Sequence, residues 1–421
     1  MLSCVNPPLT NKANPMLINS LHRGGNEQPN KIMIGIFNDN FPPILDGVAV
    51  AAQNYAYWLH KKGYESCVIT PYAPHSRDVI AAAPYPIFRY ASVPIPMRKP
   101  YRFGLPQVSL NFKRQIKGIR FDLVHTHCPF TSGLLAKHIA RRQHIPLVAT
   151  FHSKYRQDFE RAVPSKFIID REIRRIVRFY EHADEVWIPQ AAVEPTLREY
   201  GYKGHVEVVE NGNDFATPVG EIKTKRAYMR NRLKIQPKET MFLFVGQHIW
   251  EKGIDFMLES LAQIAHLPFK LFMLGTGYAV NDIRAMIERL NLSDRVQLVG
   301  VVKDRQLLKQ YFAAADLFLF PSLYDNAPLV VREAAAMHTP SLLLAESTAA
   351  EVIQDGYNGF LSPRETQVYA NMLEHLIAQP EHIANVGETA SHTIARTWED
   401  VMDEVILRYA DIKKRFELKY K

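Results

Sequence analysis

The feature that most constrains the fold of this 421-residue chain is its short apolar runs, which alternate with stretches of helical periodicity. The runs form two series along the sequence. The first run is rich in β-branched residues, which is typical of a buried strand in a parallel sheet. Strands that alternate with helices predict a doubly wound α/β domain, and two series predict two such domains. The runs lie at 31–37, 67–70, 123–126, 147–150, 185–188 and 206–209 in the first series, and at 241–245, 269–274, 296–299, 317–320 and 341–344 in the second.

The order of these runs divides the chain into segments. The first 30 residues are rich in Asn, Pro and Gly and have no apolar signal core, so we predict a flexible tail over 1–30 rather than a secretory signal. We expect the first α/β domain over 31–215 and the second over 216–397, with the polar stretch 218–238 marking the change. We expect a helix in the final segment, 398–421. Its sequence is compatible with packing on either domain, including back on the first. Two facing domains of this kind direct their strand C-termini toward a shared central cleft, where ligands bind.

Cysteine usage and charge narrow the class of protein. The three cysteines, Cys4, Cys67 and Cys128, form no Cys-x-x-Cys pair, which argues against a disulfide framework and fits a reducing, cytoplasmic compartment. No apolar run approaches the roughly 20 residues that span a bilayer. The net charge is +8, and residues 98–120 hold seven basic residues and no acid. Such a face attracts phosphates or anionic lipid, unless it serves only to keep the protein in solution. Nucleic acid is the weakest candidate partner, because no nucleic-acid-binding module accompanies the charge.

The segment with the clearest chemistry runs from Pro321 to Met337. An apolar run ends at a Pro-Ser break, a loop carrying Asp325 follows, and Glu333 stands in an Ala-rich run of strong helix formers. This order predicts strand, loop and helix, and a helix start is a natural seat for phosphate. Ionised carboxylates accept hydrogen bonds from sugar hydroxyls, so the segment predicts a nucleotide-sugar site. The plainer alternative is an ordinary junction with a solvated Asp325 and a capping Glu333.

Four further residues follow predicted strands. Gly47, in the loop after the first strand, would let the backbone approach a phosphate, unless it is only a glycine that a turn requires. His152, at the end of the run 147–150, is expected to point into the cleft, although a lone histidine is more often structural. Lys252 would neutralise a departing diphosphate, unless it is a surface lysine. Gly275 fits a backbone turn on the nucleotide side.

Missing motifs exclude several classes of enzyme. The sequence has no Asp-x-Asp, and this pair usually holds the catalytic divalent metal beside a nucleotide sugar. It has neither a P-loop nor a Gly-x-Gly-x-x-Gly fingerprint, which disfavours P-loop ATPases and dinucleotide oxidoreductases. We place His125 and His127 on opposite faces of a strand, where they would chelate a metal poorly. We therefore predict no metal site.

Taken together, these segments resemble the family 4 retaining glycosyltransferases over 32–409. The resemblance is carried by Asp46-Gly47-Val48, Thr150-Phe-His152 and the carboxylate-x7-Glu segment, and further by 211–214, 246–253 and 347–360. It implies the GT-B architecture, in which two Rossmann-like doubly wound domains face a central cleft. It also implies transfer of a hexose with retained configuration, by front-face substitution, without a metal or any other cofactor. The nucleotide diphosphate sugar is then the donor substrate.

The resemblance also assigns roles by position. Lys252 would bind the donor diphosphate, Glu333 the ribose, and Asp325 the transferred sugar, while His152 would face the sugar from the other domain. The implied catalytic residues are His152, Lys252 and Asp325, and the implied donor-binding residues are Gly47, Gly246, Gln247, Lys252, Gly275, Asp325, Asn326, Ala327, Pro328, Leu329 and Glu333.

Two positions depart from the family pattern, which usually has Glu where Asp325 stands and Arg where Gln247 stands. UDP-glucose is the donor that the family favours. The basic first domain and the segment 92–104 resemble members that act on glycerolipids, so we expect diacylglycerol or another glycerolipid as acceptor and peripheral binding to the anionic inner face of the plasma membrane. A soluble sugar or sugar phosphate stays open as the acceptor. A GT-B-like epimerase or phosphorylase and a non-catalytic nucleotide-sugar sensor stay open as the function.

Overall fold

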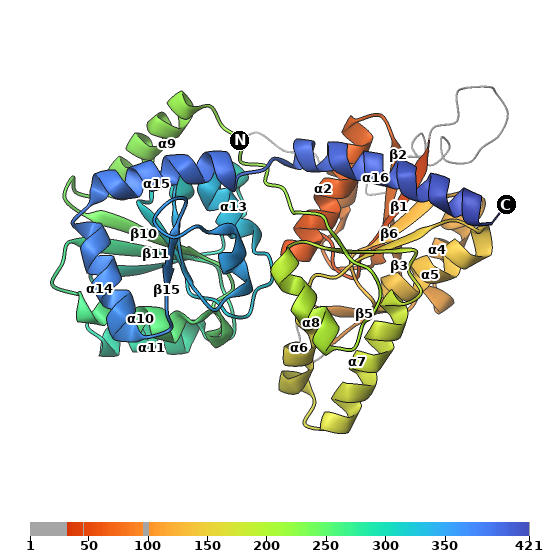
Figure 1. Cartoon of the computed structure of the whole chain (residues 1–421), viewed down its shortest axis with the longest axis horizontal. Helices are drawn as coiled ribbons and strands as arrows, with labels where there is room; N and C mark the ends of the chain where they lie inside the picture. The colour runs from red at the N-terminus through yellow and green to blue at the C-terminus, as the bar shows by residue number, and fades with distance from the viewer. Residues whose placement is uncertain (1–31, 45, 96–100, 421) are drawn as a thin grey trace, which may run out of the picture. The chain divides into compact units, whose positions relative to one another are not determined.

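The computed structural model describes residues 32–44, 46–95 and 101–420, which form two compact units (Figure 1). Within these residues, the first unit takes 32–188, 197–208 and 402–420, and the second takes 189–196 and 209–401. The predicted tail and Cys4 lie outside the described residues. Cys67 and Cys128 are buried free thiols. In the part of the chain described here, no helix combines the length and apolar character needed to cross a membrane.

The first unit is built on a seven-stranded parallel sheet with the order β3-β2-β1-β6-β7-β8-β9. All six runs of the first series are strands in it, as predicted. The order reverses between β1 and β6, and ligands in open α/β sheets bind outside the strand ends at such a point. The strands are β1 (Met33–Phe37), β2 (Glu65–Pro71), β3 (Ile87–Tyr90), β6 (Leu123–Thr126), β7 (Leu147–Thr150), β8 (Glu185–Ile188) and β9 (Glu207–Val208).

Helices connect these strands, and one antiparallel hairpin joins β4 (Ser92–Pro94) to β5 (Arg102–Gly104). Helix α2 begins at Gly47 because Asp46 caps it: Asp46 Oδ1 accepts from the backbone N–H of Ala49 at 2.7 Å. The helices of the first unit, with one short 3₁₀ helix, are α2 (Gly47–Lys61), α3 (Arg77–Ala82), η1 (Pro106–Val108), α4 (Leu110–Ile116), α5 (Thr131–Gln143), α6 (Tyr155–Ala162), α7 (Lys166–Tyr180) and the last residues of α8 (Glu194–Glu199).

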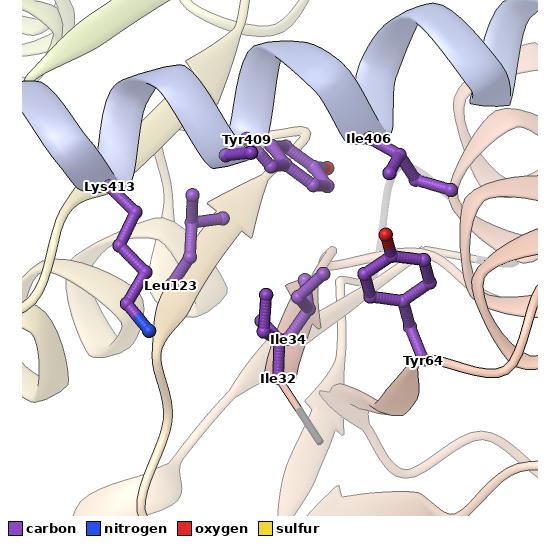
Figure 2. A pocket seen from close by; sticks show the side chains of 8 residues that line it. Ile32, Ile34, Tyr64, Leu123, Ile406, Tyr409 and Lys413 are labelled. Atoms are coloured by element: carbon purple, nitrogen blue, oxygen red, sulfur yellow. The ribbon is translucent and has the colours of Figure 1, made fainter. Parts of the chain in front are cut away.

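The final helix, α16 (Trp398–Lys419), completes the core of the first unit with its residues from Met402 onward. Figure 2 shows Ile406, Tyr409 and Lys413 pointing from α16 toward strand residues across a small apolar pocket. The Tyr409 ring stacks on Trp187 with centroids 5.5 Å apart, and its hydroxyl lies 2.6 Å from His125 Nδ1. The segment predicted to accommodate either domain is therefore shared: it starts in the second unit and ends in the first.

The second unit contains a six-stranded parallel sheet with the order β12-β11-β10-β13-β14-β15. The five predicted runs are all strands. The strands are β10 (Thr240–Val245), β11 (Phe269–Leu274), β12 (Val296–Gly300), β13 (Leu317–Phe320), β14 (Ser341–Leu344) and β15 (Phe360–Ser362). The helices are η2 (Ala191–Val193), α9 (Val219–Arg232), η3 (Trp250–Lys252), α10 (Ile254–Gln263), α11 (Val280–Arg289), α12 (Arg305–Ala314), α13 (Leu329–Ala336), η4 (Thr348–Val352), α14 (Thr366–Ile377) and α15 (Pro380–Thr393).

The polar stretch 218–238, which we expected at the change of domain, contains α9 and lies inside the second unit. Arg230 donates to Asp316 Oδ2 at 2.9 Å, and Arg226 donates to the carbonyl of Ala315 at 2.8 Å. These contacts fix α9 against the end of α12. Two of the basic residues in this polar stretch therefore hold a helix in place.

Candidate functional site

The segment after β13 has the predicted order of strand, loop and helix. β13 ends at Phe320, and α13 begins at Leu329 after Pro328, which makes no side-chain cap. Glu333 is the fifth residue of α13, so the alternative in which it caps the helix is wrong. Ser322 donates to Asp325 Oδ2 at 2.6 Å and thereby fixes this carboxylate in the loop.

Lys252 and Asp325 form an ion pair in the second unit. Lys252 Nζ lies 2.5 Å from Asp325 Oδ1 and 2.6 Å from Oδ2, and only 9% of the lysine side chain is exposed. The ammonium also lies 5.5 Å from the ring centroids of Phe320 and Tyr324. The surface-lysine alternative is therefore wrong. In this ion pair, Lys252 carries a buried positive charge at the end of the sheet.

A glycine brings the lysine to this place. Gly253 has φ +69°, and a Cβ there would lie 2.5 Å from the carbonyl oxygen of Pro321. Only glycine allows η3 to approach the end of β13 this closely. The local sequence Lys-Gly thus sets the position of the Lys252 side chain.

Two neighbouring backbone turns follow β10 and β11. Gly246 N donates to Leu274 O at 3.0 Å, and a Cβ on Gly275 would lie 1.9 Å from Gly246 O. The φ of Gly275 is +136°, which an L side chain rarely adopts. The loop that begins at Gly275 packs directly on the one that carries the exposed Gln247, and its predicted role on the nucleotide side stays a prediction.

Glu333 belongs to a second ion cluster of the same unit. Its Oε1 accepts from Arg305 Nη2 at 2.8 Å, and only 7% of its side chain is exposed. Burial raises the pKa of Glu333, and the charge of Arg305 opposes that rise. Arg305 also pairs with Asp214. Sequence reasoning missed Arg305, because nothing in its local sequence distinguishes it from other basic residues at a helix start.

His248 is a buried side chain that sequence reasoning also missed. Both of its ring nitrogens are buried without a hydrogen-bond partner, and burial lowers its pKa to about 4. The backbone of His248 holds the two turns together, because its N–H donates to Thr276 O at 3.0 Å. An unsatisfied buried nitrogen costs on the order of 1–3 kcal/mol.

Replacing His248 by leucine is therefore expected to raise the free energy of unfolding at pH 7 by about 1–2 kcal/mol. Because the folded-state pKa of His248 is lowered, its contribution to stability is complete above about pH 6.5 and is lost as the pH falls toward 4. The variant should lose less stability than the native protein in this window. Urea unfolding at several pH values measures both effects. The exposed His266 provides the control, and equal gains for His248→Leu and His266→Leu would contradict the argument.

Gly47 is the first residue of α2 in the first unit. Nothing lies within 4 Å of a Cβ built on it, and it is not among the glycines with positive φ. The alternative that a turn requires this glycine is therefore wrong. The open space at the α2 start leaves the predicted approach of a phosphate as the role to test.

His152 follows β7 and contacts the buried His127 in the first unit. Its Nε2 lies 3.0 Å from His127 Nδ1, and the two rings stack with centroids 5.3 Å apart. Burial lowers the pKa of His152 to about 4, so the ring is neutral at pH 7. A neutral imidazole at this place is suited to donate or accept a hydrogen bond and not to carry charge.

The placement of His125 and His127 on opposite faces is wrong. Residues two apart in a strand point to the same side, and these two rings lie 4.3 Å apart. His125 uses both ring nitrogens, with Thr150 Oγ1 at 2.7 Å from Nε2 and Tyr409 on the other side. His125 therefore has a structural role and no free nitrogen for a metal.

The predicted site residues fall into two groups by unit. Gly47 and His152 belong to the first unit, and the others belong to the second. In the second unit, Lys252 and Asp325 are in contact, and Asn326, Ala327, Pro328 and Leu329 lead from this pair into the start of α13.

Comparison with known proteins assigns the family. Residues 45–216 match the model described as Glycosyltransferase Family 4, and residues 225–393 match the model described as Glycosyl transferases group 1. Together the two models match most of the chain. The chain belongs to the family 4 glycosyltransferases. It is therefore an enzyme of glycosyl transfer, and its two parallel-sheet α/β units are the GT-B fold predicted from the sequence.

Relatives of this family 4 glycosyltransferase differ in their acceptors. It is 28% identical over 353 residues to alpha-monoglucosyldiacylglycerol synthase of Streptococcus pneumoniae, covering 83% of this chain and 79% of that protein. It is 28% identical over 311 residues to D-inositol 3-phosphate glycosyltransferase of Xylanimonas cellulosilytica, covering 70% of this chain and 73% of the relative. Among solved structures, Anabaena HepE in complex with UDP and glucose matches with a TM-score of 0.72 and 17% identity over 90% of this chain and 100% of HepE, a likeness of fold.

Proposed function

We propose that this enzyme transfers glucose from UDP-glucose to an acceptor hydroxyl, with retained configuration and without a metal. The observation that carries the proposal is the buried Lys252 ammonium beside Asp325 at the ends of β10 and β13. A diphosphate needs a cation close by as it departs, and Lys252 is placed to supply one. A bound diphosphate would share Lys252 and release Asp325 to accept hydrogen bonds from the sugar.

The UDP-glucose donor is supported by likeness. HepE has been solved with UDP and glucose, and the streptococcal relative is named a monoglucosyldiacylglycerol synthase. In the proposed reaction the bond from the anomeric carbon to the diphosphate oxygen breaks. The acceptor oxygen bonds to the same face of that carbon, and the acceptor proton passes to the departing phosphate oxygen. The chain supplies electrostatic stabilisation through Lys252 and orientation through Asp325, Glu333 and the neutral His152.

A screen of donors against acceptors, measuring released nucleoside diphosphate, tests the proposal. We expect UDP release from UDP-glucose that depends on an added acceptor. Isomerised sugar nucleotide would indicate an epimerase, and phosphate-dependent cleavage a phosphorylase. Tight UDP-glucose binding without turnover for any acceptor would favour a sensor. Each of these three outcomes would overturn the proposed transfer.

A glycerolipid acceptor is supported by the surface of the first unit. Four apolar side chains on β4, β5, η1 and α4 are between 46% and 67% exposed, namely Val93, Phe103, Val108 and Leu110. Exposed basic residues of α4, Lys113 and Arg114, follow them directly, with Lys117 just beyond. Apolar side chains beside basic ones suit an anionic lipid surface. The residues 96–100, which include Arg98 and Lys99 of the basic run, lie outside the described residues.

The double variant Val108→Asp/Leu110→Asp is expected to bind anionic vesicles at least about tenfold more weakly at low salt, because it replaces apolar anchors by charges that the surface repels. Sedimentation with phosphatidylglycerol-containing vesicles measures the binding, which high salt should also weaken. Leu407→Asp, at a 72% exposed leucine of α16, is the matched control. Native binding by the double variant, or an equal loss in the control, would contradict the lipid surface. A soluble sugar phosphate would then become the favoured acceptor, as in the inositol phosphate relative.

A further inference from the structure

A cluster of three charged side chains surrounds the start of α12. Arg305 Nη2 donates to Glu333 Oε1 at 2.8 Å, Arg305 Nε donates to Asp214 Oδ2 at 3.2 Å, and Nη2 also contacts Asp214 Oδ1. The three residues come from separate segments of the second unit: the stretch after β9, the start of α12, and α13. The guanidinium therefore joins two carboxylates that are 119 positions apart in the sequence.

Arg305 has two contacts besides the one to Glu333. Its guanidinium lies 4.4 Å from the ring centroid of Phe215, in addition to the pairing with Asp214. A planar guanidinium held by a carboxylate and an aromatic face loses little further freedom when it makes another hydrogen bond. The direction in which the guanidinium donates its hydrogen bond to Glu333 is consequently fixed.

The segment that carries Asp214 is itself anchored. Asn213 N donates to Arg396 O at 2.9 Å, and Trp398 N donates to Asn213 O at 3.1 Å. A Cβ on Gly212 would lie 2.6 Å from the backbone of Trp398, so only glycine allows the segment around Gly212 to approach the segment around Trp398 this closely. These contacts fix the position of Asp214, and Asp214 in turn fixes the guanidinium of Arg305.

Glu333 needs such support for the role proposed for it. An ionised carboxylate offers acceptors alone to the two hydroxyls, whereas a protonated one has a donor in place of one acceptor. The Glu333 side chain is 7% exposed, and burial opposes its charge. Arg305 compensates that charge by donating to Oε1.

We propose that Arg305, held by Asp214, is a positioning residue that fixes Glu333 as the acceptor for the ribose hydroxyls of the donor nucleotide. This inference rests on the proposed function, in which the donor is a UDP-sugar. Arg305 does not touch the sugar ring or the reacting bond. Its effect should therefore appear in the recognition of the ribose.

Calorimetric binding of UDP, 2′-deoxy-UDP and 3′-deoxy-UDP to the whole protein tests this. We expect the native protein to bind UDP about tenfold or more tightly than at least one deoxy analogue, since a hydrogen bond to a charged acceptor is lost. Arg305→Ala should reduce this ratio to within about threefold, because Glu333 loses the partner that fixes it and compensates its charge. Arg305→Lys should retain part of the ratio through its charge, and Arg284→Ala, at an exposed arginine of α11, should retain all of it.

The outcomes separate this inference from the proposed function. If Arg305→Ala keeps the native ratio, or loses affinity for UDP and both analogues equally, Arg305 has no role in ribose recognition and the inference is overturned. Where Arg305→Ala does not fold, by its thermal melting curve, Asp214→Asn and Arg305→Lys supply the same comparison, and an unchanged ratio in both has the same meaning. If the native protein itself binds no UDP, the proposed donor fails in the native arm alone, and the inference fails with it.

Discussion

Replacing Lys252 by alanine is expected to lower kcat/KM for UDP-glucose by about 10²–10³-fold, because the departing diphosphate loses its buried cation. The same change removes one partner of a buried ion pair, which typically costs 3–5 kcal/mol of stability, so folding and catalysis must be measured separately. Nucleoside diphosphate release measures the first effect, and urea unfolding the second. Lys252 Nζ contacts both oxygens of Asp325, so the loss of this one atom is expected to lower both activity and stability.

The double variant Lys252→Ala/Asp325→Asn distinguishes the two effects. It has no uncompensated carboxylate, so its free energy of unfolding should recover most of what Lys252→Ala loses. Its activity should stay about 10²-fold or more below that of Asp325→Asn alone, because a neutral side chain at 325 supplies no cation. Recovery of activity together with stability would show that Lys252 acts only by holding the fold.

Replacing Tyr409 by alanine is expected to cost the first unit about 3–5 kcal/mol of stability. The ring is buried and stacked on Trp187, so its removal leaves a cavity beside the central strands. The loss of its hydroxyl also leaves Nδ1 of the buried His125 without its partner. Thermal or urea unfolding, followed by circular dichroism, measures the loss.

Tyr409→Phe is the matched control, since it keeps the ring and removes only the hydrogen bond. It should lose about 1–3 kcal/mol, which is the cost of leaving a buried nitrogen unsatisfied. Leu407→Ala, at an exposed position of the same helix, should be nearly neutral. If Tyr409→Ala unfolds like the Leu407 variant, α16 does not complete the core of the first unit.

The strands that the sequence predicted well are those with uninterrupted apolar runs, such as β6 and β7. β3 was missed because Arg89 stands within it, and only the folded structure shows that its guanidinium donates to the carbonyls of Pro71 and Pro42. β15 is three residues long and pairs only with β14, which no local pattern indicates. The stretch 218–238 was placed at the start of the second domain, but the contacts that attach α9 there are made with Asp316, far along the chain, and have no local signal.

The candidate site divides in the same way. Asp325 and Glu333 were singled out because strand, loop and helix follow one another directly between Leu317 and Ala336. Arg305 was not found, because its partners lie 28 and 91 positions away. His248 was not found either, since its burial is produced by the packing of the Gly275 turn on its own backbone. Local order in a sequence therefore indicates candidate ligand-binding residues, and the residues that contact and support them emerge only from the folded chain.

The passage of α16 from one unit into the other has a consequence for synthesis on the ribosome. All strands of the first sheet are made before residue 210, yet Tyr409 and Lys413, which cover that sheet, are made nearly 200 residues later. Domains generally fold in the order in which they are translated. The first unit is made first, but its sheet stays partly uncovered until α16 has left the exit tunnel. The second unit, by contrast, is complete once residue 401 has left the tunnel.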